Sequence, residues 1–205
     1  MSAKLSTTRQ PARRATRQPA PRPAQTLPPA EIHAAIERLA AAIAARHPPR
    51  ETTPPPAPRP PLAPLLLLGI ANGGITLARR LAVLLPNTRA GVVDISFHRD
   101  DIGRHPIPKE FAPTHIPADV NNSTIILIDD VIQSGRTINA ALNEIFDHGR
   151  PARVELAVLI DRGSRRLPIA PDYTGLTLDV PDTEKLILRL DAADAKKDTF
   201  EIKPA

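Results

Sequence analysis

Two adjacent carboxylates and a hydroxyl-rich turn follow one apolar run in the middle of the chain. The run 124–128 ends at Asp129 and Asp130, and Gly-Arg-Thr stands four residues later at 135–137. Carboxylates accept hydrogen bonds from vicinal hydroxyls such as those of a ribose. Backbone N–H groups at a helix start, with Ser and Thr hydroxyls beside them, form a cradle for a phosphate. The pattern therefore predicts a sugar-phosphate site, with Mg²⁺ as a common companion.

Each half of this pattern also has an ordinary structural interpretation. Two Asp residues at the end of a strand can cap a turn. The residues 134–137 can be a simple helix start, because Ser is a common N-cap. A Walker-type P-loop is excluded, since its glycine and lysine spacing is absent. The residue types alone leave the functional and the structural interpretations open.

Strand and helix signals alternate along the chain and would place the acids at the edge of a sheet. Short apolar runs predict strands at 65–68, 90–97, 124–129 and 154–160. Helical periodicity predicts helices at 31–46, 76–85 and 135–147. This alternation predicts an α/β fold with a mainly parallel central sheet flanked by helices. The carboxyl ends of such strands form the ligand-binding edge, and they would bring together two loops, 71–74 and 129–137.

Composition separates a folded domain over 30–205 from a basic tail over 1–29 rich in Pro, Ala and Arg. Residues 1–30 hold six Lys or Arg and no acid, so the overall charge of +5 leaves −1 for 31–205. The tail is expected to be disordered. It could be a solvated extension, a non-specific binder of nucleic acid or an Arg-rich transit peptide, although its prolines disfavour the last.

Two further segments interrupt the expected fold. Residues 48–64 carry nine prolines and predict an exposed polyproline-type loop, either a tolerated insertion or a ligand for an SH3-like domain. The polar, proline-broken segment 98–123 is long enough for a functional flap.

The chain has no cysteine, which excludes disulfides and thiolate metal sites and makes the cytoplasm the simplest location. No apolar run approaches the roughly 20 residues of a membrane span.

Several other stretches extend the pattern around the two acids. They are "LLLLGIANGGITLARRLA", "GVVDISFHRDDI", "LIDRGSRRLPIAPDYTG" and "EKLILRL". Together with "IDDVIQSGRT", which looks like the phosphoribosyl-diphosphate (PRPP) signature of type I phosphoribosyltransferases, they resemble the PyrR family. The resemblance covers 31–202 apart from the Pro-rich segment. It implies the type I phosphoribosyltransferase fold with a small hood or flap, at least a dimer, uracil phosphoribosyltransferase activity and attenuation of pyrimidine operons.

The resemblance also implies a role for individual residues. Asp129 and Asp130 would hold the ribose hydroxyls, and Arg99 would contact pyrophosphate with Asp100 and Asp101 at the base of the flap. The remaining PRPP contacts would come from Ala71, Asn72, Gly73, Val131, Ile132, Gln133, Ser134, Gly135, Arg136 and Thr137. The uracil would meet Ile160, Asp161, Arg162 and Gly163, chiefly through backbone groups. Mg²⁺ would be held mainly by PRPP and water.

The implied reaction converts uracil and PRPP into UMP and pyrophosphate through a transition state that resembles an oxocarbenium ion. Catalysis would consist of positioning, with Mg²⁺ and Arg99 stabilising the departing pyrophosphate. The flap would exclude the water that hydrolyses PRPP.

Two positions depart from the family pattern. Asn72-Gly73 stands where the family usually has Thr-Arg, so a relative with little activity is one alternative. Gln133 stands where the family usually has an aromatic residue and purine enzymes have Asp, so it argues against a purine base. A second alternative is an RNA-binding regulator that senses uridine nucleotides. The chain has four Phe, one Tyr and no Trp on which RNA bases could stack, which favours the enzyme.

Overall fold

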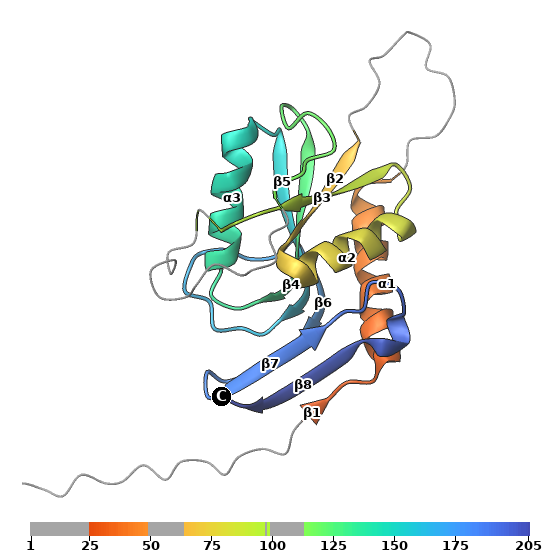
Figure 1. Cartoon of the computed structure of the whole chain (residues 1–205), viewed down its shortest axis with the longest axis vertical. Helices are drawn as coiled ribbons and strands as arrows, with labels where there is room; N and C mark the ends of the chain where they lie inside the picture. Colours follow the sequence, from red (N-terminus) through yellow and green to blue (C-terminus); the bar gives the residue numbers. More distant parts are fainter. Residues whose placement is uncertain (1–24, 49–63, 97, 99–112) are drawn as a thin grey trace, which may run out of the picture.

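The computed structural model describes residues 25–48, 64–96, 98 and 113–205 (Figure 1). Most of the predicted tail, nearly all of the Pro-rich segment and the flap residues Arg99, Asp100 and Asp101 lie outside the described residues. Within the described ranges, no helix is both long enough and apolar enough to cross a lipid bilayer.

The core of the fold is a parallel sheet of five strands in the order β3-β2-β4-β5-β6. The strands are β2 (Leu65–Ile70), β3 (Thr88–Val93), β4 (Thr124–Ile132), β5 (Arg153–Asp161) and β6 (Tyr173–Thr177). In the centre of the sheet, Leu67 pairs with Ala90 on one side and with Ile126 on the other. The predicted α/β fold with a parallel sheet is confirmed.

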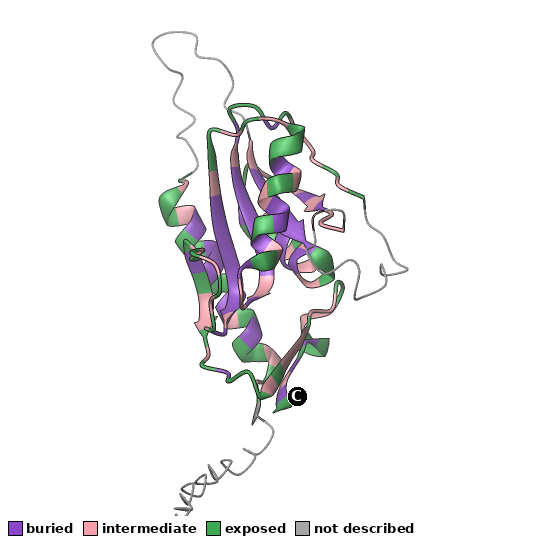
Figure 2. Cartoon of the chain, turned by 90° about the vertical axis from the view of Figure 1, so that its left-hand side faces the viewer, coloured by how far each residue is buried: buried purple, intermediate pink, exposed green. Residues whose placement is uncertain are grey.

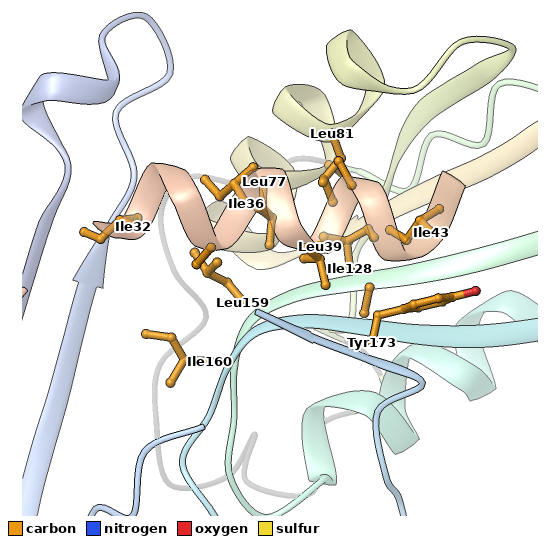
Figure 3. Packing of buried hydrophobic residues seen from close by; sticks show 14 of the residues in the cluster. Ile32, Ile36, Leu39, Ile43, Leu77, Leu81, Ile128, Leu159, Ile160 and Tyr173 are labelled. Carbon is orange, nitrogen blue, oxygen red and sulfur yellow. The ribbon is translucent and has the colours of Figure 1, made fainter. Parts of the chain in front are cut away.

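Helices cover both faces of this sheet (Figure 1). They are α1 (Pro29–Arg46), α2 (Ala71–Leu84) and α3 (Arg136–His148). Helix α1 begins with Pro29, whose missing N–H is not needed in the first turn, and it ends at Arg46, two residues before Pro48. Figure 3 shows the apolar row of α1 against α2 and the sheet, namely Ile32, Ile36, Leu39, Ile43, Leu77, Leu81 and Leu159.

The continuous apolar runs of the strands are explained by burial on both faces. In β4, Ile126 and Ile128 belong to the core under α1 and α2, while Ile125 and Leu127 belong to the core under α3. All four side chains are buried, and Figure 2 shows the strand interior as a buried layer between partly exposed helices. Each such side chain contributes roughly 1.5–3 kcal/mol of transfer free energy.

A second, antiparallel sheet of three short strands lies beyond the carboxyl ends of the main strands (Figure 1). We call it the hood, and it consists of β1 (Gln25–Thr26), β7 (Glu184–Arg189) and β8 (Thr199–Pro204), with the short helix η1 (Ala195–Lys197) before β8. Arg80 of α2 anchors it, with Nη1 at 2.6 Å from Asp198 Oδ2 and Nη2 at 2.8 Å from Asp198 Oδ1. The hood is therefore tied to the same helix whose first turn lies at the sheet edge.

Some element boundaries differ from the sequence-based expectation. The predicted strand 90–97 ends at Val93, because Asp94 Oδ1 accepts hydrogen bonds from the backbone N–H and hydroxyl of Ser96 and turns the chain. Helix α2 begins five residues earlier than predicted. Strand β1 falls inside the segment assigned to the tail, because it pairs with β8.

Candidate active site

Asp129 and Asp130 occupy the carboxyl-terminal part of β4. Asp129 is 4% exposed, and its Oδ1 accepts a hydrogen bond of 3.1 Å from the backbone N–H of Asp130. Burial, and then the neighbouring charge of Asp130, raises the pKa of Asp129 well above its ordinary value. Burial also raises the pKa of Asp130. The pair therefore resists carrying two negative charges. Hydroxyl groups that donate hydrogen bonds, or a bound cation, would stabilise the state in which both carboxyl groups are ionised.

The first turn of α2 lies directly against this acid pair. A Cβ atom placed on Gly73 would come within 2.1 Å of Asp130 Oδ2, so any larger residue there would require the Asp130 side chain to move. The positive end of the α2 dipole therefore faces a carboxylate. The interpretation of 71–74 as a loop is wrong, because Ala71, Asn72 and Gly73 begin the helix. An arginine at position 73 would likewise require Asp130 to move.

Ala71 carries backbone strain at the junction between β2 and α2. Its φ of 51° lies in the left-handed region, which costs roughly 1–2 kcal/mol for a residue with a Cβ atom. The junction is also crowded, because a Cβ atom on Gly69 would meet Ile75 Cα at 2.5 Å. Strain of this kind persists where the surrounding structure enforces it, and it is frequent at binding sites.

A turn, residues 133–137, is present where the phosphate cradle is predicted, and we call it the phosphate turn. Its irregular part is shorter than the loop 129–137 expected from the sequence. Strand β4 continues to Ile132, so only residues 133–135 separate it from α3. Gly135 caps the helix with a φ of 88°, a conformation that favours glycine. The Ser134 hydroxyl accepts a 3.3 Å hydrogen bond from the backbone N–H of Arg136 and braces the turn. The turn therefore holds the positive end of α3 at the sheet edge, where helices bind phosphate.

Val131 and Ile132 connect the acids to this turn as ordinary strand residues. Val131 pairs with Ile160, and Ile132 pairs with Asp161 on β5. The side chain of Val131 packs against the core under α1 and α2, and that of Ile132 is buried in the core under α3. Their place in the structure is to set the spacing between Asp130 and the phosphate turn.

The predicted base-binding residues form a turn at the end of β5. Asp161 Oδ1 accepts a 2.9 Å hydrogen bond from the backbone N–H of Gly163, and a Cβ atom on Gly163 would meet no atom within 4 Å. Arg162 is 7% exposed, and its side chain donates hydrogen bonds to the segment that leads to the hood. Its Nη2 donates to the backbone carbonyls of Val180, Pro181 and Glu184 at 3.3, 3.3 and 3.2 Å. The backbone N–H groups of Arg162 and Gly163 are both engaged within the protein, since that of Arg162 donates to the Ile132 carbonyl at 3.2 Å. The role of this turn in binding the base stays a prediction.

Arg165 links the base turn to the phosphate turn and was missed from the sequence. Its Nη1 donates to the carbonyl of Gln133 at 2.8 Å, and its Nη2 lies 2.7 Å from Asp161 Oδ2. Its Nε donates to the carbonyl of Ile169 at 3.0 Å. The neighbouring Arg166 instead reaches the exposed Asp182 at 3.4 Å. Nothing in residue type separates the two arginines, so only the fold identifies Arg165 as the one that positions the site.

Gln133 extends from the phosphate turn toward the hood. Its Nε2 donates to Asp182 Oδ1 at 3.3 Å, and Asp182 stands two residues before β7. The structure thus brings four predicted segments to one sheet edge, namely 71–73, 129–130, 133–137 and 160–163. Arg99, the predicted pyrophosphate contact, lies outside the described residues.

The chain matches known proteins over most of its length. The family model for the phosphoribosyl transferase domain matches residues 30–191. The Bifunctional protein PyrR of Ralstonia nicotianae is 47% identical over 137 residues, which cover 66% of this chain and 79% of that protein. The Bifunctional protein PyrR of Akkermansia muciniphila is 40% identical over 169 residues, which cover 80% of this chain and 88% of that protein.

Solved structures with lower identity share the fold. A hypoxanthine-guanine phosphoribosyltransferase from Bacillus anthracis superposes with a TM-score of 0.57 at 17% identity, covering 88% of this chain and 97% of its own. A purine phosphoribosyltransferase from Pyrococcus horikoshii gives a TM-score of 0.52 at 21% identity, covering 72% and 82%. The chain therefore has the type I phosphoribosyltransferase fold, and its sequence relatives show that it belongs to the PyrR family within the phosphoribosyl transferase domain family.

Proposed function

We propose that this protein transfers a phosphoribosyl group from PRPP to uracil and releases diphosphate. The observation that carries the proposal is the convergence of the acid pair, the phosphate turn and the base turn at one sheet edge. In the reaction, the bond between the ribose C1′ and the diphosphate oxygen breaks and a bond between C1′ and uracil N1 forms. The N1 proton leaves, and the products are UMP and diphosphate.

The two ends of the ribose phosphate would meet different parts of strand β4 and its turn. Asp129 and Asp130 would accept hydrogen bonds from the ribose 2′ and 3′ hydroxyls, which relieves the mutual repulsion of the carboxylates. The 5′-phosphate would lie on the turn 133–137, at the positive end of α3. The strand segment Val131–Ile132 is rigidly paired, so the distance between the two subsites is fixed before the substrate binds.

The base would lie against the turn at the end of β5. Gly163 presents backbone rather than a side chain, and the space beside its Cα is open. The N–H groups of uracil could donate to carbonyl oxygens of this turn, each of which has two lone pairs. Arg165 holds this turn and the phosphate turn in a fixed relation through Asp161 and Gln133. Such preorganisation would align the base with C1′.

A divalent cation suits the donor set at this edge. Carboxylate oxygens are preferred ligands of Mg²⁺, and burial together with mutual repulsion raises the pKa of the acid pair, a cost that a cation would relieve. Mg²⁺ bound mainly by PRPP and water, beside Asp129 and Asp130, would supply charge neutralisation for diphosphate. On the protein side, the N–H groups of the α2 first turn and Arg99 would stabilise the departing diphosphate.

The test is a panel of bases assayed with PRPP and Mg²⁺, namely uracil, orotate, hypoxanthine, guanine and adenine. We expect turnover of uracil alone. Asp129→Asn combined with Asp130→Asn should lower kcat/KM for PRPP by at least about 100-fold, the scale of losing preorganised polar contacts. Asp119→Asn, at an exposed position, is the matched control and should retain full activity. Turnover of hypoxanthine without uracil, or undiminished activity of the double variant, would refute the proposal.

A second candidate function is the RNA-binding regulation of pyrimidine genes that the family resemblance implies. A second activity would be consistent with the name "Bifunctional protein PyrR" of the relatives. The basic tail could add salt-dependent affinity for RNA. A deletion that tests this should stop at residue 24, because β1 at Gln25–Thr26 pairs with β8 of the hood. If the tail alone binds RNA, the deletion should abolish binding and its salt dependence. Sequence-selective binding by the truncated protein would support a regulator built into the fold.

A further inference from the structure

Three potential metal ligands converge on one point away from the acid pair. His98 Nε2 lies 3.1 Å from Glu144 Oε2 and 3.3 Å from Asp147 Oδ2. The three ligand atoms all lie within 4.8 Å of one another. His98 stands in a turn after β3, and the two acids stand near the end of α3. We propose that these residues bind a divalent transition-metal ion of the zinc class.

The two separations from His98 Nε2 match those of a tetrahedral metal site. Ligand bonds of about 2.0–2.1 Å at tetrahedral angles place neighbouring ligand atoms about 3.3 Å apart. The observed distances of 3.1 and 3.3 Å from His98 Nε2 fall at this value. One imidazole and two carboxylates also form a donor set that suits zinc and its neighbours in the first transition row.

A hydrogen bond from His98 explains the convergence of the three side chains less completely than a bound metal ion does. A single Nε2–H can be donated along one direction, so it can satisfy only one of the two carboxylates that face it. The second carboxylate would then gain charge attraction only when the imidazole is protonated. A metal ion at the convergence point would bind the nitrogen lone pair and both carboxylates together.

Outer contacts hold Glu144 in the orientation that a metal site requires. Thr114 Oγ1 donates to Glu144 Oε1 at 2.6 Å and itself accepts a 2.9 Å hydrogen bond from the backbone N–H of Asp94. His148 Nε2 lies 3.1 Å from the same Oε1. These contacts engage one oxygen of Glu144 and leave Oε2 directed at His98. Partners of this kind orient metal ligands and tune their affinity.

The position on α3 supplies a second electrostatic argument. The carboxyl end of a helix carries partial negative charge, so acids in the last turn are unfavourable there. Asp147 lies in the last turn of α3, and Glu144 lies one turn before its end at His148. A bound cation would neutralise both acids and the helix end. It would also cross-link the turn after β3 to α3, whose opposite end forms the phosphate turn.

The experiment is a titration of the metal-free full chain with Co²⁺, which reports four-coordinate binding by strong visible absorption. We expect one Co²⁺ per chain, displaced by Zn²⁺, and a rise of Tm with either metal because only the folded state presents the site. His98→Asn and Glu144→Gln should abolish the absorption band. Thr114→Val should weaken binding by about 10–100-fold, the usual effect of removing an outer partner.

The matched control is His33→Asn. His33 and Glu37 form a His–Glu pair at 3.3 Å on α1, with both side chains about half exposed, and they are not part of the cluster. This variant should bind Co²⁺ like the wild type. Asp147→Asn alters a side chain that is 69% exposed, so it tests the site without threatening the core, and far-UV circular dichroism checks the fold of every variant. Absence of the band in the wild type, or its survival in His98→Asn, would overturn the proposal.

Discussion

At the scale of residues, the acid pair is maintained at a cost to stability. Asp129 is buried beside a second carboxylate, and both effects raise its pKa. The backbone N–H of Asp130 offsets only part of this cost. A buried, mutually repelling pair is expected where function rather than stability selects the residues.

Asp129→Asn should therefore make the protein more stable at neutral pH while impairing catalysis. The folded-state pKa of Asp129 is raised above its unfolded-state value. Its favourable contribution to folding stability is therefore present below the unfolded-state pKa and is lost as pH rises through the folded-state pKa. Asn carries no charge and retains Oδ1 for the Asp130 N–H. We expect a gain of about 1 kcal/mol at pH 7, the usual scale of a stabilising substitution.

Urea unfolding of both proteins from pH 3 to pH 8 measures this difference. The gain in unfolding free energy should shrink toward zero in acid, because Asp129 is then protonated in both states. A variant that is less stable than the wild type at pH 7 would contradict the account.

Residue types and spacing were sufficient to predict the acids and the phosphate turn, because their chemistry is local in sequence. Asp129, Asp130 and Gly135 lie within seven consecutive residues. Arg165 could not be found this way, because its function depends on the Gln133 carbonyl and on Asp161 across two strand ends. The close contact between Gly73 and Asp130 could not be predicted from the sequence either, because 57 positions separate the two residues.

At the scale of elements, the buried strands were predictable and the hood strands were not. Strands β2, β4 and β5 each carry a continuous apolar run because both faces of the sheet are covered there. In β7, by contrast, the apolar run is only three residues long, 186–188, and all three side chains are partly buried, so the signal is weaker. The hood was expected only from the family resemblance. The early start of α2 was missed because Asn72, Gly73 and Gly74 are poor helix formers. The close packing of the two glycines against β4 is a feature of the fold that the sequence does not reveal.

The ion pair between α2 and the hood should be a main determinant of hood stability. Arg80 makes two contacts of 2.6 and 2.8 Å with Asp198, whose side chain is fully buried. Arg80→Met would leave that charge without its partner, which typically costs about 3–5 kcal/mol. We expect this loss in urea unfolding, with faster hydrogen exchange in β7 and β8.

Two further variants separate charge burial from side-chain loss. Arg79→Met, at the exposed neighbouring position on α2, should stay within about 0.5 kcal/mol of the wild type. Adding Asp198→Asn to Arg80→Met removes the buried charge and should recover part of the loss. Equal effects of Arg79→Met and Arg80→Met would argue against a role for the ion pair.

At the scale of the whole molecule, Glu155 joins the first helix to the far edge of the sheet. Its carboxylate accepts a 2.6 Å hydrogen bond from the Tyr173 hydroxyl on β6 and lies 2.7 Å from His47 Nε2 after α1. Arg153 Nε is 2.6 Å away and Arg46 Nε is 3.4 Å away. Burial, and then the hydrogen bond to Glu155, raises the pKa of Tyr173, so the phenol stays a donor at neutral pH.

This network should largely determine how stable the fold is at acidic pH. Burial alone would raise the pKa of Glu155, but hydrogen bonds from Tyr173 and His47 and nearby positive charge lower it below its ordinary value of 4.5. Because the folded-state pKa is lowered, the contribution of Glu155 to folding stability is present above the unfolded-state pKa. It is lost as pH falls through the folded-state pKa. Glu155→Gln should therefore cost about 1.5–3 kcal/mol at pH 7, the scale of hydrogen bonds to a charged group.

The cost of Glu155→Gln should decline as pH falls through the lowered folded-state pKa of Glu155, because the wild-type carboxylate then becomes neutral as well. Unfolding free energies from urea titrations at pH 7, 5 and 3.5 test this convergence. Glu201→Gln is the matched control, because Glu201 contacts Lys203 at 3.8 Å on the surface of the hood, with both side chains nearly half exposed. Its effect should stay below about 1 kcal/mol at every pH. Stability curves of Glu155→Gln and the wild type that run parallel from pH 7 to pH 3.5 would show that the carboxylate charge does not link α1 to the sheet.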